Sequence, residues 1–384
     1  MSKIKILISG DFCPIGRTGR LLNEGAFSSV FNGFEKLVAT VDYAIVNLEC
    51  PVTLSDRKIE KTGPCIKTEN TEALRALQFA GFNLLTLANN HILDYDEQGV
   101  IDTVENAKKF GFATIGAGKN IEEAKKPVIK DLKGIKIGFI NIAENEFCAA
   151  DHNAAGAHTL DLIGNLKEIA DLRTKVDKVI LIYHGGREHY QLPSPNQRKT
   201  FRFLIENGVD AIVAHHTHCV SGFEYYDGKP IVYSLGNFIF DYKEKYQRGN
   251  WTEGMSVVLH LEDDSFKVQV IPHFQGRKSD PTLHLLKDND HKIFVERVEN
   301  LNRVITDDHL FKNEWQSYLA SQEKFYLSSL YIKNIYIRFL FIKGIFPISL
   351  LRSKHNKLIL NLIRCEAHHE ITKDILSAAA KKNY

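Results

Sequence analysis

The feature that most constrains the fold is an alternation of short β-rich runs with amphipathic segments, which continues to about Phe274. Apolar and β-branched residues dominate the short runs, and the segments between them carry apolar side chains at helical spacing. This order predicts an α/β domain. The predicted strands are Ile4–Ser9, Tyr43–Leu48, Asn83–Ala88, Ile135–Ile142, Lys178–Tyr183 and Ala211–Ala214. The predicted helices are Glu24–Val41, Glu69–Ala80, Glu97–Phe110, Leu162–Val176 and Asn196–Asn207.

Two later turns have the composition of β-hairpins. Tyr226-Asp-Gly-Lys229 joins two β-rich runs, and Glu262-Asp-Asp-Ser265 joins Met255–Leu261 to Phe266–Ile271. We therefore expect a layered α/β sandwich, part parallel and part antiparallel, over residues 1–280. Beyond Gln275 the sequence pattern changes, and residues 281–384 are predicted to form a mainly helical extension.

Charge and cysteine content exclude some classes of protein. The 49 Lys and Arg residues almost balance the 47 Asp and Glu residues, so no global positive field favours a nucleic-acid partner. The 6 cysteines are sparse over this length, which fits reduced thiols better than a disulfide framework. The apolar run at the N-terminus is too short for a signal peptide, so we expect a cytoplasmic protein.

The segment Phe325–Leu351 is strongly apolar and aromatic, but Lys333, Arg338 and Lys343 interrupt it. Each charge at the centre of a bilayer costs roughly 2.5 to 3.5 kcal/mol, which argues against a helix that spans a membrane. The favoured interpretation is a helix packed on the main domain or on a partner. The alternatives are an interfacial membrane helix, whose basic side chains reach toward the headgroups, and a locally disordered tail.

Polar side chains collect where the predicted strands end. In open α/β sheets, ligands bind at the carboxyl ends of strands, because loops of different origin converge there. Carboxylate, amide and imidazole groups at those ends form a ligand set for one or two divalent cations. An extended His216-Thr-His218 segment would place both imidazoles on one side. The strand-end motifs are Gly10-Asp11, Asn47-Leu-Glu49, Asn89-Asn90-His91, His184-Gly-Gly-Arg187-Glu188 and His215-His216-Thr-His218.

Each motif alone also has a structural interpretation. A Gly-Asp pair after a strand is usually a turn, and an isolated Asn-His pair is usually part of a loop. Their joint occurrence at five strand ends favours a metal site instead. Arg17 and Arg187 are either surface cations or bidentate partners of an anionic substrate.

These residues together resemble the bacterial capsule synthesis protein CapA family, which is associated with poly-γ-glutamate synthesis. Its domain is similar to the calcineurin-type metallophosphatase fold, so the resemblance implies an α/β/β/α sandwich. The similarity covers roughly residues 4–245. It rests on the strand-end motifs above, on Gly16-Arg17, and on Tyr233-Ser-Leu-Gly-Asn-Phe238, where the side-chain amide of Asn237 is expected to reach the site.

The resemblance also implies a role for individual residues. It makes Glu49 the ligand that bridges two metals and His91 the general acid beside the leaving group. The metallophosphatase pattern usually has a histidine at position 13, so Cys13 either supplies a thiolate or leaves the first site weak. The remaining expected ligands are Asp11 and His218 at the first metal, and Asn90, His184 and His216 at the second. Further candidates are His215 and Asn237 near the metals, and Arg17 and Glu188 at the substrate.

The function implied is a hydrolase that uses one or two Mn, Zn or Fe ions and cleaves a phosphoester, γ-glutamyl or amide bond. Its substrate would be an anionic small molecule or polymer in the synthesis or modification of capsule or another exopolymer. The alternative is a non-catalytic accessory protein that docks a membrane-bound exopolymer synthase through its C-terminal helices. Either role fits a cytoplasmic protein that works at the inner face of the membrane.

Overall fold

The computed structural model describes residues 3–61, 63–351, 359 and 363. Contacts divide the chain into a first compact unit that ends at Phe311 and a second that begins at Lys312. Most of the predicted extension beyond residue 351 lies outside the described residues. Among those that are described, no helix combines the length and the apolar character needed to cross a membrane.

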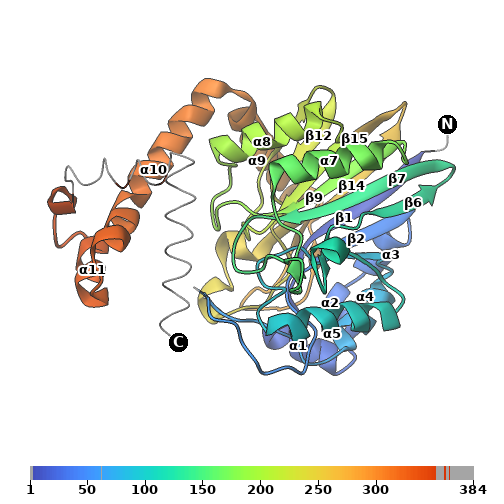
Figure 1. Cartoon of the computed structure of the whole chain (residues 1–384), viewed down its shortest axis with the longest axis horizontal. Helices are drawn as coiled ribbons and strands as arrows, with labels where there is room; N and C mark the ends of the chain where they lie inside the picture. The colour runs from blue at the N-terminus through green and yellow to red at the C-terminus, as the bar shows by residue number, and fades with distance from the viewer. Residues whose placement is uncertain (1–2, 62, 352–358, 360–362, 364–384) are drawn as a thin grey trace. The chain divides into compact units, whose positions relative to one another are not determined.

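Two mixed sheets form the centre of the first unit (Figure 1). In the first sheet β1, β2, β3 and β4 run parallel, and β14, β15 and β16 extend it antiparallel beyond β1, which also pairs with β13. The bounds are β1 (Ile4–Phe12), β2 (Tyr43–Leu48), β3 (Leu84–Thr86), β4 (Ala113–Ile115), β13 (Asn237–Ile239), β14 (Glu253–Glu262), β15 (Ser265–Phe274) and β16 (His284–Leu285).

The second sheet has the order β11-β12-β10-β9-β7-β6. Strands β7, β9, β10 and β12 are parallel, and β6 and β11 pair antiparallel at the two edges. The bounds are β6 (Val128–Leu132), β7 (Ile135–Ala143), β9 (Lys178–His184), β10 (Ala211–His215), β11 (Phe223–Tyr226) and β12 (Lys229–Val232). Strands β5 (Ala117–Gly118) and β8 (Gly156–Ala157) form a separate small pair.

Alternation along β1 shows how the layers are built. Ile6 and Ile8 pack between the two sheets, whereas Leu7 belongs to the core beneath the helices of the first sheet. A third core, which includes Leu181 of β9 and Leu204 of α8 (Pro195–Glu206), lies under the helices of the second sheet. Three buried layers between four structural layers confirm the predicted α/β/β/α sandwich.

Helices cover the outer face of each sheet, as Figure 1 shows. The first sheet is covered by α1 (Gly16–Asn23), α2 (Phe27–Phe31), α3 (Phe34–Val38), α4 (Glu72–Ala80) and α5 (Asp96–Lys109). The second is covered by α7 (Leu162–Arg173) and α8 (Pro195–Glu206), while the short α6 (Ile121–Ala124) contacts β5 and β8. The second unit contains most of α10 (Asp308–Tyr331), α11 (Ile335–Ile342) and the 3-10 turn Ile348–Leu351.

The single helix predicted over Glu24–Val41 is wrong. The structure has α2 and α3 instead, because Asn32 and Gly33 lie between them with φ of 48° and 89°. Asn and Gly are the residues that adopt this left-handed conformation at least cost, so the chain turns at this pair.

The first compact unit extends past residue 280, where the predicted main domain ends. Helix α9 (Asp288–Thr306) belongs to this unit and buries Phe294 and Val298 in the core between the sheets. The charge-rich composition of the helix reflects its exposed face, on which Ile293 is 52% exposed.

Replacing Phe294 with Ala should lower the free energy of unfolding by about 3–5 kcal/mol, because a buried aromatic ring leaves a cavity. The matched substitution of its exposed neighbour, Ile293→Ala, should change it by less than about 0.5 kcal/mol. Urea unfolding measures both. Equal small effects would contradict the assignment of α9 to the core of the first unit.

Candidate metal centre

The chain folds tightly around Asp11 at the end of β1. A Cβ atom on the preceding Gly10 would lie 2.1 Å from the carbonyl oxygen of Gly236, so only glycine allows the two backbones to approach. The carboxylate of Asp11 accepts hydrogen bonds from Asn47 Nδ2 at 2.7 Å and from the backbone N–H of His216 at 3.2 Å. Asp11 is thus fixed between the first sheet and the loop that follows β10.

Glu49 follows β2 directly and is fully buried. Neither carboxyl oxygen has a hydrogen-bond partner among the described residues. Burial, reinforced by the neighbouring Asp11, raises the pKa of this carboxyl well above its usual range. A buried carboxylate without donors is costly unless a cation compensates it.

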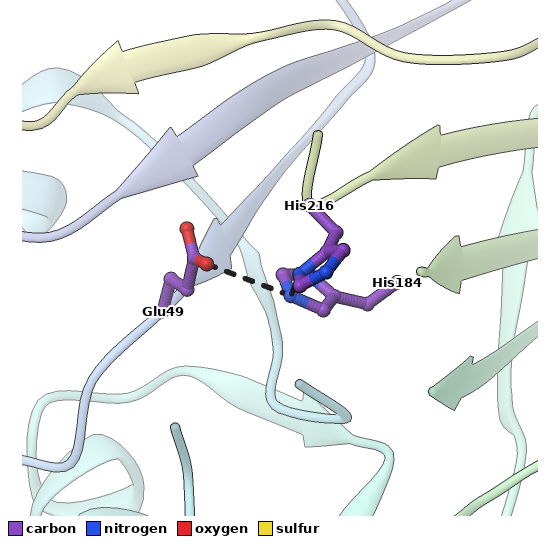
Figure 2. A group of neighbouring side chains, drawn as sticks. All are labelled: Glu49, His184 and His216. Carbon is purple, nitrogen blue, oxygen red and sulfur yellow. Dashed lines mark hydrogen bonds and ion pairs between the residues drawn. The ribbon is translucent and has the colours of Figure 1, made fainter. Parts of the chain in front are cut away.

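A first group of ligand atoms faces Glu49 from the second sheet (Figure 2). His184 ends β9, and its Nε2 lies 3.5 Å from Glu49 Oε1, 3.1 Å from Asn90 Oδ1 and 3.1 Å from His216 Nδ1. Ligands bound about 2.1 Å from one ion stand roughly 3 Å apart, which is the spacing of these atoms. The four side chains therefore outline one cation site.

The backbone at His216 and His218 differs from the prediction. Strand β10 ends at His215, and the next residues are not extended, because His216 has a φ of 95° and His218 a φ of 54°. The two imidazoles converge through this irregular backbone and not through strand alternation. Non-glycine residues in the left-handed region carry strain of about 1–3 kcal/mol, which is typical of functional sites.

A second group consists of Asp11, Glu49 and His218, whose ligand atoms lie within 4.8 Å of one another. His218 Nε2 is 3.7 Å from Glu49 Oε1, and its Nδ1 lies 2.9 Å from Asn237 Oδ1. The ring of Trp251 packs on His218 with 4.6 Å between ring centroids. Asn237 and Trp251 thus orient the imidazole, and Glu49 is shared by both groups.

The electrostatics of the two groups fit divalent cations. Burial lowers the pKa of His216 to about 3, and it lowers the pKa values of His184 and His218 well below the usual range, so all three imidazoles are neutral at pH 7. Neutral imidazoles can bind metal ions but cannot compensate the carboxylates of Glu49 and Asp11. A set of buried carboxylates, imidazoles and one amide oxygen is the donor chemistry of Mn, Zn or Fe sites.

His91 lies beside these groups in a network that was only partly predicted. Its Nδ1 is 2.6 Å from Asp94 Oδ2, which accepts a hydrogen bond and fixes Nδ1 as the protonated nitrogen. Lys61, whose side chain is 3% exposed, forms an ion pair with Asp94 and donates to the carbonyl oxygen of Asn90 at 3.1 Å. No hydrogen bond to Nε2 of His91 occurs among the described residues.

The network residues differ in how visible they are in the sequence. Asp94 follows His91 at the i+3 position, so a search for a carboxylate beside the histidine would have found it. Lys61 lies in an irregular segment between β2 and α4, and no pattern marks it.

Glu144 is a further residue that the sequence analysis missed. It follows β7, and its Oε1 lies 3.4 Å from His216 Nε2, on the side of the ring away from His184. Its backbone N–H donates to the carbonyl oxygen of His184 at 2.9 Å, and its carboxylate accepts from the N–H of Gly186 at 3.1 Å. Burial raises the pKa of its carboxyl to about 7. The strand-end rule, applied to the fourth predicted strand, identifies it.

Arg17 does not have the substrate-binding geometry that was expected. Its Nε and Nη2 atoms form a bidentate pair with Asp241 at 3.0 and 2.8 Å, and Nη1 donates to the carbonyl oxygen of Lys278 at 2.9 Å. Because protein acceptors already engage the guanidinium, it ties α1 to two distant loops.

Three other candidate residues, Cys13, His215 and Glu188, do not belong to either ligand group. Cys13 belongs to neither ligand group and packs with Cys50 and Phe240, where burial raises the pKa of its thiol well above the usual range. His215 Nε2 donates to the carbonyl oxygen of Ser9 at 3.1 Å, so this ring joins the two sheets. Glu188 is exposed after β9, and its negative charge contributes to the raised pKa of Glu49.

Comparison with known proteins supports the resemblance. The family model described as "Bacterial capsule synthesis protein PGA_cap" matches residues 5–242, more than half of the chain. "Capsule biosynthesis protein CapA" of Bacillus anthracis is 29% identical over 283 residues, which cover 70% of this chain and 67% of that protein. "PGA biosynthesis protein CapA" of Bacillus subtilis (strain 168) is 33% identical over 217 residues, 56% of this chain and 57% of that protein.

A "Probable polyglutamine synthesis accessory protein" of Mycobacterium tuberculosis is 27% identical over 218 residues, 53% of this chain and 56% of that protein. The chain therefore spans about two thirds of the first relative and little more than half of the other two.

Solved structures with a similar fold are more distant. A hypothetical protein from Thermus thermophilus aligns with a TM-score of 0.45 at 13% identity, over 74% of this chain and 100% of that one. Vacuolar Protein Sorting 29 from Cryptosporidium parvum aligns with a TM-score of 0.28 at 10% identity, over 71% and 99%. These scores are too low to add to the argument from the residues. The family-model match is decisive, and the chain belongs to the bacterial capsule synthesis protein family that this model describes.

Proposed function

We propose that this protein is a metal-dependent hydrolase of a phosphoester, γ-glutamyl or other amide bond. It would act in the synthesis or modification of capsule or another anionic exopolymer. The observation that carries the proposal is Glu49, which belongs to both groups of candidate metal ligands. Its two buried carboxyl oxygens lack hydrogen-bond partners among the described residues.

Each part of the site can be assigned a role in the proposed reaction. A divalent cation bound here would acidify water and polarise a phosphoryl or acyl oxygen. His91 supplies a proton from Nε2 to the leaving oxygen or nitrogen as its bond to phosphorus or carbon breaks. Asp94 stabilises the charged ring before that transfer, and Lys61 holds Asp94 in place. Trp251 shields one side of His218 from water.

The names of the relatives support the biological context of the proposal. Two of them are named for capsule or PGA biosynthesis. The relative from Mycobacterium tuberculosis is named as a probable accessory protein, and Cys13 stands where the metallophosphatase pattern has a histidine. These two observations favour the second candidate, a non-catalytic accessory role with a structural metal site.

Replacing Glu49 with Gln should abolish binding of Mn²⁺ or Zn²⁺ at both groups, because the shared carboxylate is lost. It should leave the metal-free protein at least as stable as the wild type, since Gln removes a carboxyl group whose burial is uncompensated without a metal. Calorimetric titration and thermal unfolding after chelation measure the two effects. Glu253→Gln, outside both groups, is the control. Unchanged metal binding by Glu49→Gln would contradict the proposed ligand set.

Truncating Glu144 to Ala should weaken metal binding by roughly 10- to 100-fold, because a carboxylate that orients a ligating imidazole is lost. Glu144→Gln should retain part of the affinity, since its side-chain oxygen still accepts from His216 Nε2. The matched control is the exposed Glu146→Ala, which should bind metal as the wild type does. An equal loss in this control would instead make Glu144, Glu146 and His216 a metal site of their own.

Replacing His91 with Ala should lower turnover by roughly a hundredfold to ten-thousandfold while metal content stays unchanged, because the lost group is an acid and not a ligand. The assay uses glycerol phosphate and γ-glutamyl nitroanilide with the metal-loaded full chain, because both leaving groups need a proton. The buried His273→Ala, outside both ligand groups, controls for loss of a histidine from the fold. Full activity of His91→Ala would contradict the role of His91 as the acid, whereas no activity of the loaded wild type on either class would favour the accessory role.

A further inference from the structure

The second compact unit exposes an unusual number of large apolar side chains. In the described part of residues 325–351, here called the apolar segment, Ile335, Tyr336, Ile345 and Leu350 are each more than 60% exposed. Further apolar side chains in the same segment are exposed to a smaller degree, namely Phe325, Tyr326, Ile337, Phe339, Ile342 and Phe346. Contiguous exposure of this kind marks a surface that binds something.

The charges of the apolar segment all have one sign. Its charged residues are Lys333, Arg338 and Lys343, and the sequence contains no Asp or Glu between Glu323 and Glu366. The chain elsewhere is nearly balanced, with 49 basic and 47 acidic residues. A purely basic, aromatic and aliphatic stretch is therefore a local property that calls for an anionic, partly apolar binding partner.

The length of helix α11 decides whether it could cross a membrane or only lie along its surface. Helix α11 contains 8 residues, which correspond to about 12 Å of rise, whereas the hydrocarbon core of a bilayer is about 30 Å thick. Arg338 lies in the middle of this helix, and Lys343 follows its end with Nζ 5.4 Å from the centroid of the Phe339 ring. Basic side chains beside aromatic rings suit the boundary between headgroups and acyl chains.

We propose that the apolar segment binds the surface of a membrane that contains anionic lipids. Its apolar side chains would enter the headgroup boundary, and its basic side chains would pair with lipid phosphates. A second copy of the chain fits less well, because a symmetric contact would bring two purely basic segments together. A protein partner would have to present an acidic surface around an apolar groove. The proposal concerns the second unit and does not rest on the proposed catalytic activity.

The test is cosedimentation of the full chain with vesicles of phosphatidylcholine alone or mixed with phosphatidylglycerol. The wild type should bind only the mixed vesicles, and added salt should weaken binding. Binding to neither kind of vesicle, or equal binding to both, would overturn the proposal. A stable dimer that binds no vesicles would overturn it in favour of a second copy.

Charge reversal in the apolar segment provides a sharper test. The triple variant Lys333→Glu, Arg338→Glu, Lys343→Glu should bind mixed vesicles on the order of a hundredfold more weakly. The control with the same change in net charge is Lys36→Glu, Lys199→Glu, Lys267→Glu, made at exposed positions of the first unit. This control should bind as the wild type does, and equal losses in both triple variants would contradict a specific surface.

Removing apolar side chains tests the other half of the proposal. The variant Phe339→Ser, Ile342→Ser should lose binding, whereas Ile163→Ser, at a position 73% exposed on α7, should not. Circular dichroism verifies that each variant keeps its helices. A folded Phe339→Ser, Ile342→Ser variant that binds like the wild type would overturn the proposal.

Discussion

The buried and uncompensated carboxyl group of Glu49 is the constraint on which the candidate site depends. Its carboxyl group is fully buried, lies near that of Asp11, and finds no hydrogen-bond donor among the described residues. The surrounding imidazoles are held neutral by burial, so they offer lone pairs and no positive charge. Folding this arrangement without a cation would leave a cost of several kcal/mol. One or two divalent ions would remove that cost, with the carboxylates, the imidazoles and the Asn90 amide as ligands.

The sandwich brings these groups together from distant parts of the chain. Parallel strands β1, β2 and β3 deliver Asp11, Glu49 and Asn90 from one sheet, while β9 and β10 lead into His184, His216 and His218 from the other. The hydrogen bond from His215 to the Ser9 carbonyl joins the two sheets beside this cluster. The inter-sheet core of Ile6, Ile8, Ile180 and Val213 holds the two sets in register. The affinity of the candidate site for a metal ion would thus depend on the packing of both sheets.

Much of this could be predicted from the sequence because each ligand follows a hydrophobic run that forms a strand. The layers and the ligand residues are therefore visible as a pattern. The sequence pattern does not show which side chains pair with one another. It could not show that Asp241 engages Arg17, that Lys61 reaches Asp94 from an irregular segment, or that His216 and His218 leave the extended conformation. The break at Asn32 and Gly33 was also hidden, because apolar spacing continues across it.

The most direct test of a metal centre organised by Glu49 is a crystal structure of the full chain with anomalous diffraction measured at metal absorption edges. The account predicts one or two anomalous peaks about 2.1 Å from the carboxylate oxygens of Glu49. Further ligands should come from Asp11 and His218 on one side and from Asn90, His184 and His216 on the other. Crystals grown with added Mn²⁺ or Zn²⁺ that show no peak there, and a Glu49 carboxylate bonded to water or to protein donors, would contradict it.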